Sequence, residues 1–190
     1  MSEPDVTQIV AGSGVLYVAP LGTALPVAGV HGEYPVVWTS WIPVGYTDAG
    51  IDFVYTPSIK EIMVDELAAP VLDVLTTEKA HIAAHLAEAS LANLNRAISA
   101  STFTDNSLTL GDINLNAGSQ PLSYMMVGVQ CPAPGTNKAR ILIFYKAITN
   151  TAVSLKIQRK DKVVIPVQFE ARQLSGQHLW DAYDFAIGAS

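Results

Sequence analysis

The chain has 190 residues, a length that suits a single domain with a sizeable core. Hydrophobic residues make up 49% of it and the mean hydropathy is +0.28, so we expect part of the apolar surface to be buried against other subunits. The net charge of −6 disfavours a general nucleic-acid-binding role, and the sequence has no apolar run long enough for a membrane-spanning helix.

The charge is unevenly distributed along the sequence. Residues 1–78 contain ten acidic residues and one basic residue, a net charge of −9, whereas residues 79–190 carry +3. Opposite charges on opposite faces would suit a subunit that stacks head to tail, but a solvated surface segregated by chance explains the pattern equally well. The first ten residues predict no secretory signal, and the single Cys131 excludes an internal disulfide and suits a reducing cytoplasm.

The first strand in chain order is predicted at Gly14–Ala19. Residues 20–43 follow, interrupted by seven proline and glycine residues, and they predict an extended arm or long loop. Three aromatic residues in this arm either tuck under the core or anchor on a neighbouring subunit, a role for which tryptophan and tyrosine are favoured. They are Tyr34, Trp38 and Trp41.

Gly45–Tyr55 is predicted as a strand whose odd-numbered residues pack on the core. Asp48 and Asp52 then point together into a polar space, about 13 Å apart along the strand. The next strand, roughly Ser58–Leu67, has no clear inner face because two sets of apolar residues compete for it. It carries three acidic residues, Glu61, Asp65 and Glu66.

Residues 77–100 fit two interpretations. Their alanine, leucine and glutamate content favours one long helix. Alternation from Ala80 to Leu86 instead predicts a strand, followed by a short helix that Ser90 caps. Periodicity does not decide between strand and helix over residues 78–89. Residues 101–120 predict a polar loop with a weak strand at Ser107–Leu110.

Four further strands are predicted in the C-terminal half. Leu122–Cys131 and Arg140–Ile148 are apolar on both faces, so each should be buried on both sides, in the monomer or in an assembly. Residues 152–159 and 161–171 alternate between apolar and polar side chains. They predict a hairpin joined by Arg159–Lys162.

No arrangement of residues predicts catalysis or a bound cofactor. His81 and His85 lack a third ligand and the glutamate of a zincin motif, which favours a solvated polar face over a metal site. Cys131 lies in an apolar strand without a nearby histidine, which favours an inert buried thiol. Asp48 and Asp52 are expected to be too far apart for two-carboxylate glycoside chemistry. We therefore expect no enzyme, no cofactor and no metal.

Several motifs in a fixed order resemble the major tail tube proteins of long, non-contractile-tailed bacteriophages, the siphophage tail tube family. The first is Trp41–Ile51 (WIPVGYTDAGI), followed by a second acidic strand. Lys79–Glu88 then leads into the helix candidate Ser90–Ile98, and Asp161–Arg172 (DKVVIPVQFEAR) closes the pattern. In that family such an opening begins a long hairpin, an LxNL helix follows a strand, and an IPVxFEA strand ends the sheet. The order of these motifs over residues 14–172 carries the resemblance.

The resemblance implies a mainly β fold. Two packed antiparallel sheets would form a sandwich or squashed barrel, with one short α-helix and a long hairpin or arm, in a single domain over residues 1–190. Its core would be 14–172, with the arm at 20–43 and a C-terminal segment at 173–190. The family pattern also favours strand plus helix over residues 78–99.

The resemblance further implies a structural virion protein and not an enzyme. Six copies would form a ring, and rings would stack into a hollow tail tube with an acidic lumen for genome passage during ejection. The partners would be the chain itself and other tail proteins, such as the tape measure, terminator and distal tail proteins. Phage DNA would pass without tight binding, no membrane would be involved, and the protein would be assembled in the host cytoplasm and reside in the virion tail.

Site residues follow from the matched positions. The lumen is expected to be faced by Asp48, Asp52 and Glu61. Contacts with a neighbouring subunit or ring are expected from Tyr34, Trp38, Trp41, Asp65 and Glu66. The C-terminal segment 173–190, with Trp180, Tyr183 and Phe185, lies beyond the matched motifs, and we expect it to cover the outside or bridge subunits.

Two alternatives remain open. One is a related tube or terminator subunit of another phage-tail-like or secretion assembly, which would share the fold and differ in partners. The other is a ligand-binding β-barrel or a hydrolase, for which no convergent polar pocket can be assembled from the sequence.

Overall fold

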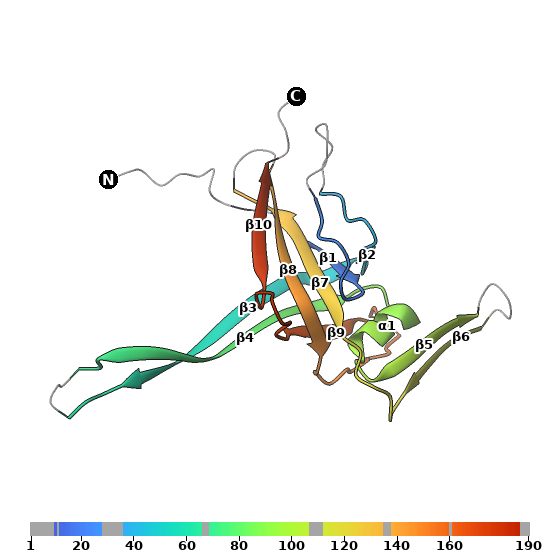
Figure 1. The fold of residues 1–190 in the computed structure, drawn as a ribbon. Helices are drawn as coiled ribbons and strands as arrows, with labels where there is room; N and C mark the ends of the chain where they lie inside the picture. Colours follow the sequence, from blue (N-terminus) through green and yellow to red (C-terminus); the bar gives the residue numbers. More distant parts are fainter. Residues whose placement is uncertain are drawn as a thin grey trace.

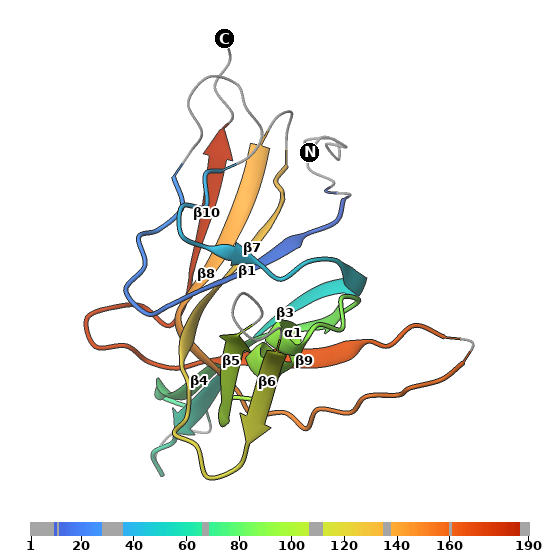
Figure 2. The same cartoon turned by 90° about the vertical axis from the view of Figure 1, so that its right-hand side faces the viewer.

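The computed structural model describes residues 10, 12–27, 36–65, 69–106, 112–134, 138–159 and 161–186. Over these residues the chain forms an eight-stranded antiparallel sheet, a separate two-stranded hairpin and one short helix (Figures 1 and 2). The predicted mainly β class is confirmed. Within the described ranges, no helix is long and apolar enough to cross a membrane.

The main sheet has the strand order β2-β1-β7-β8-β9-β4-β3, and β10 pairs with the part of β8 that β9 leaves free. β5 and β6 form the separate hairpin. In chain order the elements are β1 (Val15–Ala19), β2 (Ile42–Pro43), β3 (Thr47–Ile62), β4 (Leu72–Leu86), α1 (Leu91–Ala97), β5 (Ser101–Asn106), β6 (Asp112–Ala117), β7 (Met125–Pro132), β8 (Lys138–Thr149), β9 (Ile165–Ala171) and β10 (Asp181–Ala186).

The main sheet folds over on itself between β8 and β9, so that its two halves pack as layers around one core. Ile82 of β4 and Phe169 of β9 lie in the same buried cluster as Leu16 of β1 and Val127 of β7. Figures 1 and 2 show β7, β8 and β10 running steeply across β3, β4 and β9. The two packed layers expected from the sequence are therefore halves of one open, continuous sheet.

The segment 77–100 divides into a strand and a helix. Alternate residues of β4 are buried from Ala80 to Leu86, and α1 begins after Ser90, whose Oγ accepts a hydrogen bond from the Asn93 backbone N–H at 3.2 Å. The buried Asn93 side chain donates to the carbonyls of Val44 and Glu88, both at 2.9 Å. The bond to Val44 joins the helix to the segment before β3, and the bond to Glu88 fixes the link between β4 and the helix. The strand-plus-helix interpretation is confirmed.

The hairpin prediction in the N-terminal half is wrong in its boundaries. Residues 58–62 continue β3 and do not begin a second strand, and the returning strand is β4. The cause is that this stretch is exposed on both faces, so burial imposes no alternation that would mark one strand.

Three predictions in the C-terminal half also need correction. The stretch 152–159 forms no strand, so the hairpin expected between it and 161–171 is not present, although β9 is. Residues 101–106 and 112–117 pair as β5 and β6, where a polar loop was expected. The weak strand at Ser107–Leu110 lies outside the described residues. The segment 173–190 contains β10, which pairs with β8 and so belongs to the main sheet.

The arm packs on its own subunit. An isolated bridge between Val27 and Val37 closes its base, and Trp41, only 6% exposed, donates from Nε1 to the Ala24 carbonyl at 2.9 Å. Trp38 stacks on Tyr17 with ring centroids 4.1 Å apart. Both tryptophans therefore bury most of their ring surface against their own subunit. The third aromatic residue, Tyr34, lies outside the described residues.

Candidate assembly surface

The hairpin formed by β3 and β4 projects from the body of the molecule (Figure 1). Every described residue at positions 54–65 and 69–79 is exposed. Many of these are large and apolar: Val54, Tyr55, Ile59, Ile62, Met63, Val64, Val71, Leu72, Val74 and Leu75. An apolar surface of this extent on a soluble subunit marks a protein–protein interface.

The apolar residues occupy both faces of the hairpin. Cross-strand partners in an antiparallel pair lie on the same face. One face continues outward from Phe53, which packs on the core, to Ile59 opposite Leu75. The other face carries Ile62 opposite Leu72. We call the exposed part of the hairpin, residues 54–65 and 69–79, the outer hairpin. Its apolar side chains can be buried on both faces only by contacts that a single subunit does not supply.

Asp48 and Asp52 share a face, and they lie closer together than the sequence predicts. A bulge at Ala49–Gly50, where both residues have positive φ (62° and 88°), adds two residues to β3. As a result Asp48 is opposite His85 and Asp52 is opposite Ala83, two residues apart on β4. The separation along the sheet falls from about 13 Å to about 7 Å.

The two aspartates differ in their electrostatic surroundings. The Lys162 ammonium lies 2.7 Å from the Asp48 carboxylate, and this hydrogen bond holds the pKa of Asp48 below its ordinary value. Asp48 is therefore ionised at neutral pH, a state that suits an ion pair and not a general acid. Asp52 is exposed and has no ion-pair partner among the described residues.

The other acidic residues predicted for the site do not gather with this pair. Glu61 is opposite Asp73, and the register of β3 places it on the face that Phe53 occupies, opposite to the face of Asp52. Asp65 is exposed just beyond the end of β3. Glu66 lies outside the described residues.

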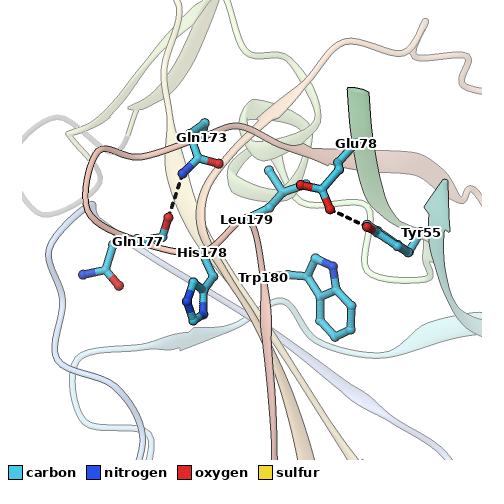
Figure 3. A pocket seen from close by; sticks show the side chains of 7 residues that line it. All are labelled: Tyr55, Glu78, Gln173, Gln177, His178, Leu179 and Trp180. Carbon is cyan, nitrogen blue, oxygen red and sulfur yellow. Dashed lines mark hydrogen bonds between the residues drawn. The ribbon is translucent and has the colours of Figure 1, made fainter. Parts of the chain in front are cut away.

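Trp180 holds the base of the hairpin. It lies in the loop before β10, and its ring is 4.9 Å from the ring of Phe53 and 5.8 Å from that of Tyr55. The Tyr55 hydroxyl donates to the Glu78 carboxylate across the hairpin. Figure 3 shows Trp180, Tyr55 and Glu78 lining a hollow of about 470 Å³ together with the loop residues Gln173, Gln177, His178 and Leu179. The C-terminal loop therefore fixes the direction in which the hairpin leaves the body.

Trp180→Ala is expected to destabilise the subunit by about 2 kcal/mol, less than a fully buried tryptophan because Trp180 is half-buried. Urea denaturation measures this loss. Hydrogen exchange should also show faster exchange of the amides near Phe53 and Tyr55, because the hairpin base loses its aromatic support. Trp180→Phe keeps a ring in place and should lose less than half as much. Equal losses for the two variants would show that ring contact does not hold the hairpin.

The remaining candidate groups have no arrangement for catalysis or metal binding. His81 and His85 share a face of β4, and four residue steps along the strand separate them by about 13 Å, too far to bind one ion. Burial raises the pKa of the Cys131 thiol, which lowers its reactivity. Within the part of the chain that the structure describes, no three histidine, cysteine, aspartate or glutamate side chains form a metal-binding group.

The exposed apolar residues of the hairpin are the functional feature that sequence reasoning missed. The available signal was the conflict between Ile59 and Met63 on one side and Ile62 and Val64 on the other. Such a conflict is expected for a strand that is apolar on both faces and covered by other subunits. A β-rich subunit with a projecting hairpin of this kind has the character of a self-assembling structural protein.

The family model described as phage tail tube protein matches residues 1–184, so the chain belongs to the phage tail tube protein family. It is a structural protein of the virion tail, and it assembles with itself and with other tail components. No curated protein matches the chain.

Proposed function

We propose that this chain assembles into hexameric rings and that the rings stack into a hollow tube through which the genome passes during ejection. The observation that carries the proposal is the outer half of the β3–β4 hairpin, exposed and apolar on both faces. Membership of the tail tube family supports the tube, and the siphophage resemblance supplies the number six.

The energy available from the hairpin is of the right order for assembly. Burying a valine, leucine or isoleucine side chain completely contributes roughly 1.5–3 kcal/mol. The apolar residues of the outer hairpin are already partly covered, so about 1 kcal/mol each is a reasonable share, or about 10 kcal/mol for the set. Association costs roughly 4–15 kcal/mol. Burial of the hairpin therefore about balances the free-energy cost of association, and a stable tube needs further contacts between subunits.

We place Asp48 and Asp52 on the wall of an acidic lumen. Two observations support this placement: the two aspartates share one face of the β3–β4–β9 layer, and both carboxylates are accessible to solvent. A ring of six copies with a net charge of −6 each carries about −36. Repulsion between such a wall and DNA phosphates keeps the genome from binding as it passes.

Asp52→Lys is expected to leave tube formation intact and to make the lumen attract DNA. Asp52 is the better position because Asp48 already holds Lys162. Virions carrying Asp52→Lys should lose infectivity at least about tenfold, since bound phosphates slow passage. Asp52→Asn, which removes the charge without reversing it, serves as the matched control and should be less affected. Normal infectivity and ejection with Asp52→Lys would contradict the lumen assignment.

Negative-stain electron microscopy of the purified protein tests the assembly itself. Long hollow tubes that appear above a threshold concentration are expected. Closed rings that never stack would instead favour a terminator-like subunit. A protein that remains monomeric even with a tail initiation complex present would contradict the proposal.

A further inference from the structure

The segment 151–159 has the sequence of a strand but no strand partner. Its apolar residues Val153, Leu155 and Ile157 alternate with polar ones. In the described part of the chain, no backbone hydrogen bond joins this segment to another element. Leu155 is 39% exposed and Ile157 is 83% exposed. Figure 2 shows the segment as one limb of the long loop from β8 to β9.

The loop that contains the segment is held near the β3–β4–β9 layer at both ends. Val153 packs against the core cluster that contains Ile165 of β9. At the far side of the loop, Lys162 forms the ion pair with Asp48 at the start of β3. Between these two attachments, Leu155 and Ile157 are exposed and available to a neighbouring copy.

β3 offers an edge that such a segment can join. It is the terminal strand of the main sheet, and along its 16 residues it pairs with β4 only. The backbone groups of its other edge have no partner strand within the described residues. An unpaired edge of this length is a template for an added strand.

Charge favours the same match. Residues 47–86, which contain the hairpin, have seven acidic and two basic residues, a net charge of −5. Residues 151–162 have four basic residues and one acidic residue, a net charge of +3. Two surfaces of opposite charge attract each other and disfavour contacts between like surfaces.

We propose that residues 152–158 of one copy add as a strand to the free edge of β3 in the next copy. β4 separates β9, into which the loop leads, from the free edge of β3, so the segment meets that edge in another copy. The contact therefore joins two different surfaces of neighbouring copies, an arrangement that generates a ring when the rotation closes. This inference rests on the proposed function and adds the partner surface to it.

Hydrogen exchange on monomers and on tubes tests the pairing. The amides of 152–158 should exchange freely in the monomer and become at least about 100-fold slower in tubes, because strand pairing protects amides. Exchange that stays fast in well-formed tubes would overturn the inference while leaving the proposed function standing. Failure of the wild-type protein to form tubes would overturn both.

Leu155→Pro removes one backbone donor and blocks strand pairing at that point. Among the described residues Leu155 has no backbone hydrogen-bond partner, so thermal unfolding of the monomer should not change while tubes disappear. The matched control is Leu21→Pro, in an exposed turn where Gly22 has a φ of 82° and proline fits the preceding position. Normal tubes from Leu155→Pro would contradict the proposal.

Disulfide formation identifies the partner strand. The native cysteine is first removed with Cys131→Ser. In that background Ile157→Cys is combined with Pro57→Cys or with Ile59→Cys, two residues on one face of β3. A third variant combines Ile157→Cys with Asp161→Cys in the same loop. Oxidised tubes should yield covalent multimers with at least one β3 partner. A link to position 161 within one chain, without any β3 link, would show that the segment pairs with its own β9 limb and would overturn the inference.

Discussion

Ile59→Ser combined with Leu75→Ser is expected to raise the concentration at which tubes form about 30-fold while leaving the monomer folded. The two residues are cross-strand partners on the outer hairpin, 60% and 51% exposed, so the subunit loses little when they become polar. An interface loses about 2 kcal/mol, which raises the concentration required for assembly about 30-fold at a single contact. Pelleting assays across a concentration series measure this threshold, and circular dichroism reports the fold of the monomer.

Leu21→Ser combined with Val37→Ser provides the control for the hairpin pair. These residues are exposed to a similar extent, but they lie in the segment between β1 and β2 and not in the β3–β4 hairpin. The control should assemble like the wild type. If the hairpin variant assembles at the wild-type concentration, or if both variants fail equally, the hairpin is not the principal assembly surface.

Gly128→Ala is expected to destabilise the subunit by about 3 kcal/mol, because Gly128 of β7 lies where the arm tryptophans pack on the sheet. A Cβ at Gly128 would lie 2.5 Å from the Trp38 ring and 3.1 Å from that of Trp41, so Trp38 must move. It would give up its stack on Tyr17 and its 2.6 Å hydrogen bond to the buried Gln130. We expect the melting temperature to fall by about 6–12 °C.

A double-mutant cycle decides whether the Trp38 ring is the cause. In a Trp38→Ala background the collision is absent, so Gly128→Ala should cost less than about 1 kcal/mol further. Urea denaturation followed by circular dichroism measures all four proteins. Additive losses would contradict the account, since they would place the cost in β7 itself and not in its contact with the arm.

The strands that bury a face were predictable from the sequence. β9 alternates along its length, and β7 and β8 are apolar on both faces because the core lies on one face and the arm residues Val36, Trp38 and Trp41 lie on the other. For β4 the alternation of Ala80 to Leu86 was one of two possible interpretations, because the composition also allowed one long helix. The family resemblance favoured the strand and the short helix that Ser90 caps, and the structure has both.

The segments that we propose to contact neighbouring copies were not predictable in the same way. Neither face of the outer hairpin is buried in the subunit, so no alternation of apolar and polar residues marks the length of β3. The segment 152–159 has a strand pattern and no strand, because period-two alternation does not say whether the partner edge belongs to the same copy. Gly45–Tyr55 was predicted as one regular strand, so the bulge at Ala49–Gly50 that brings Asp48 and Asp52 together was not foreseen.

The most direct test of the central claim is a cryo-electron-microscopy reconstruction of the tube assembled from the purified protein. The account predicts that the outer half of the β3–β4 hairpin is buried between copies, with Asp52 on the channel side. A reconstruction in which this hairpin remains exposed to solvent on the outside of the tube would contradict the proposed role of the hairpin in assembly.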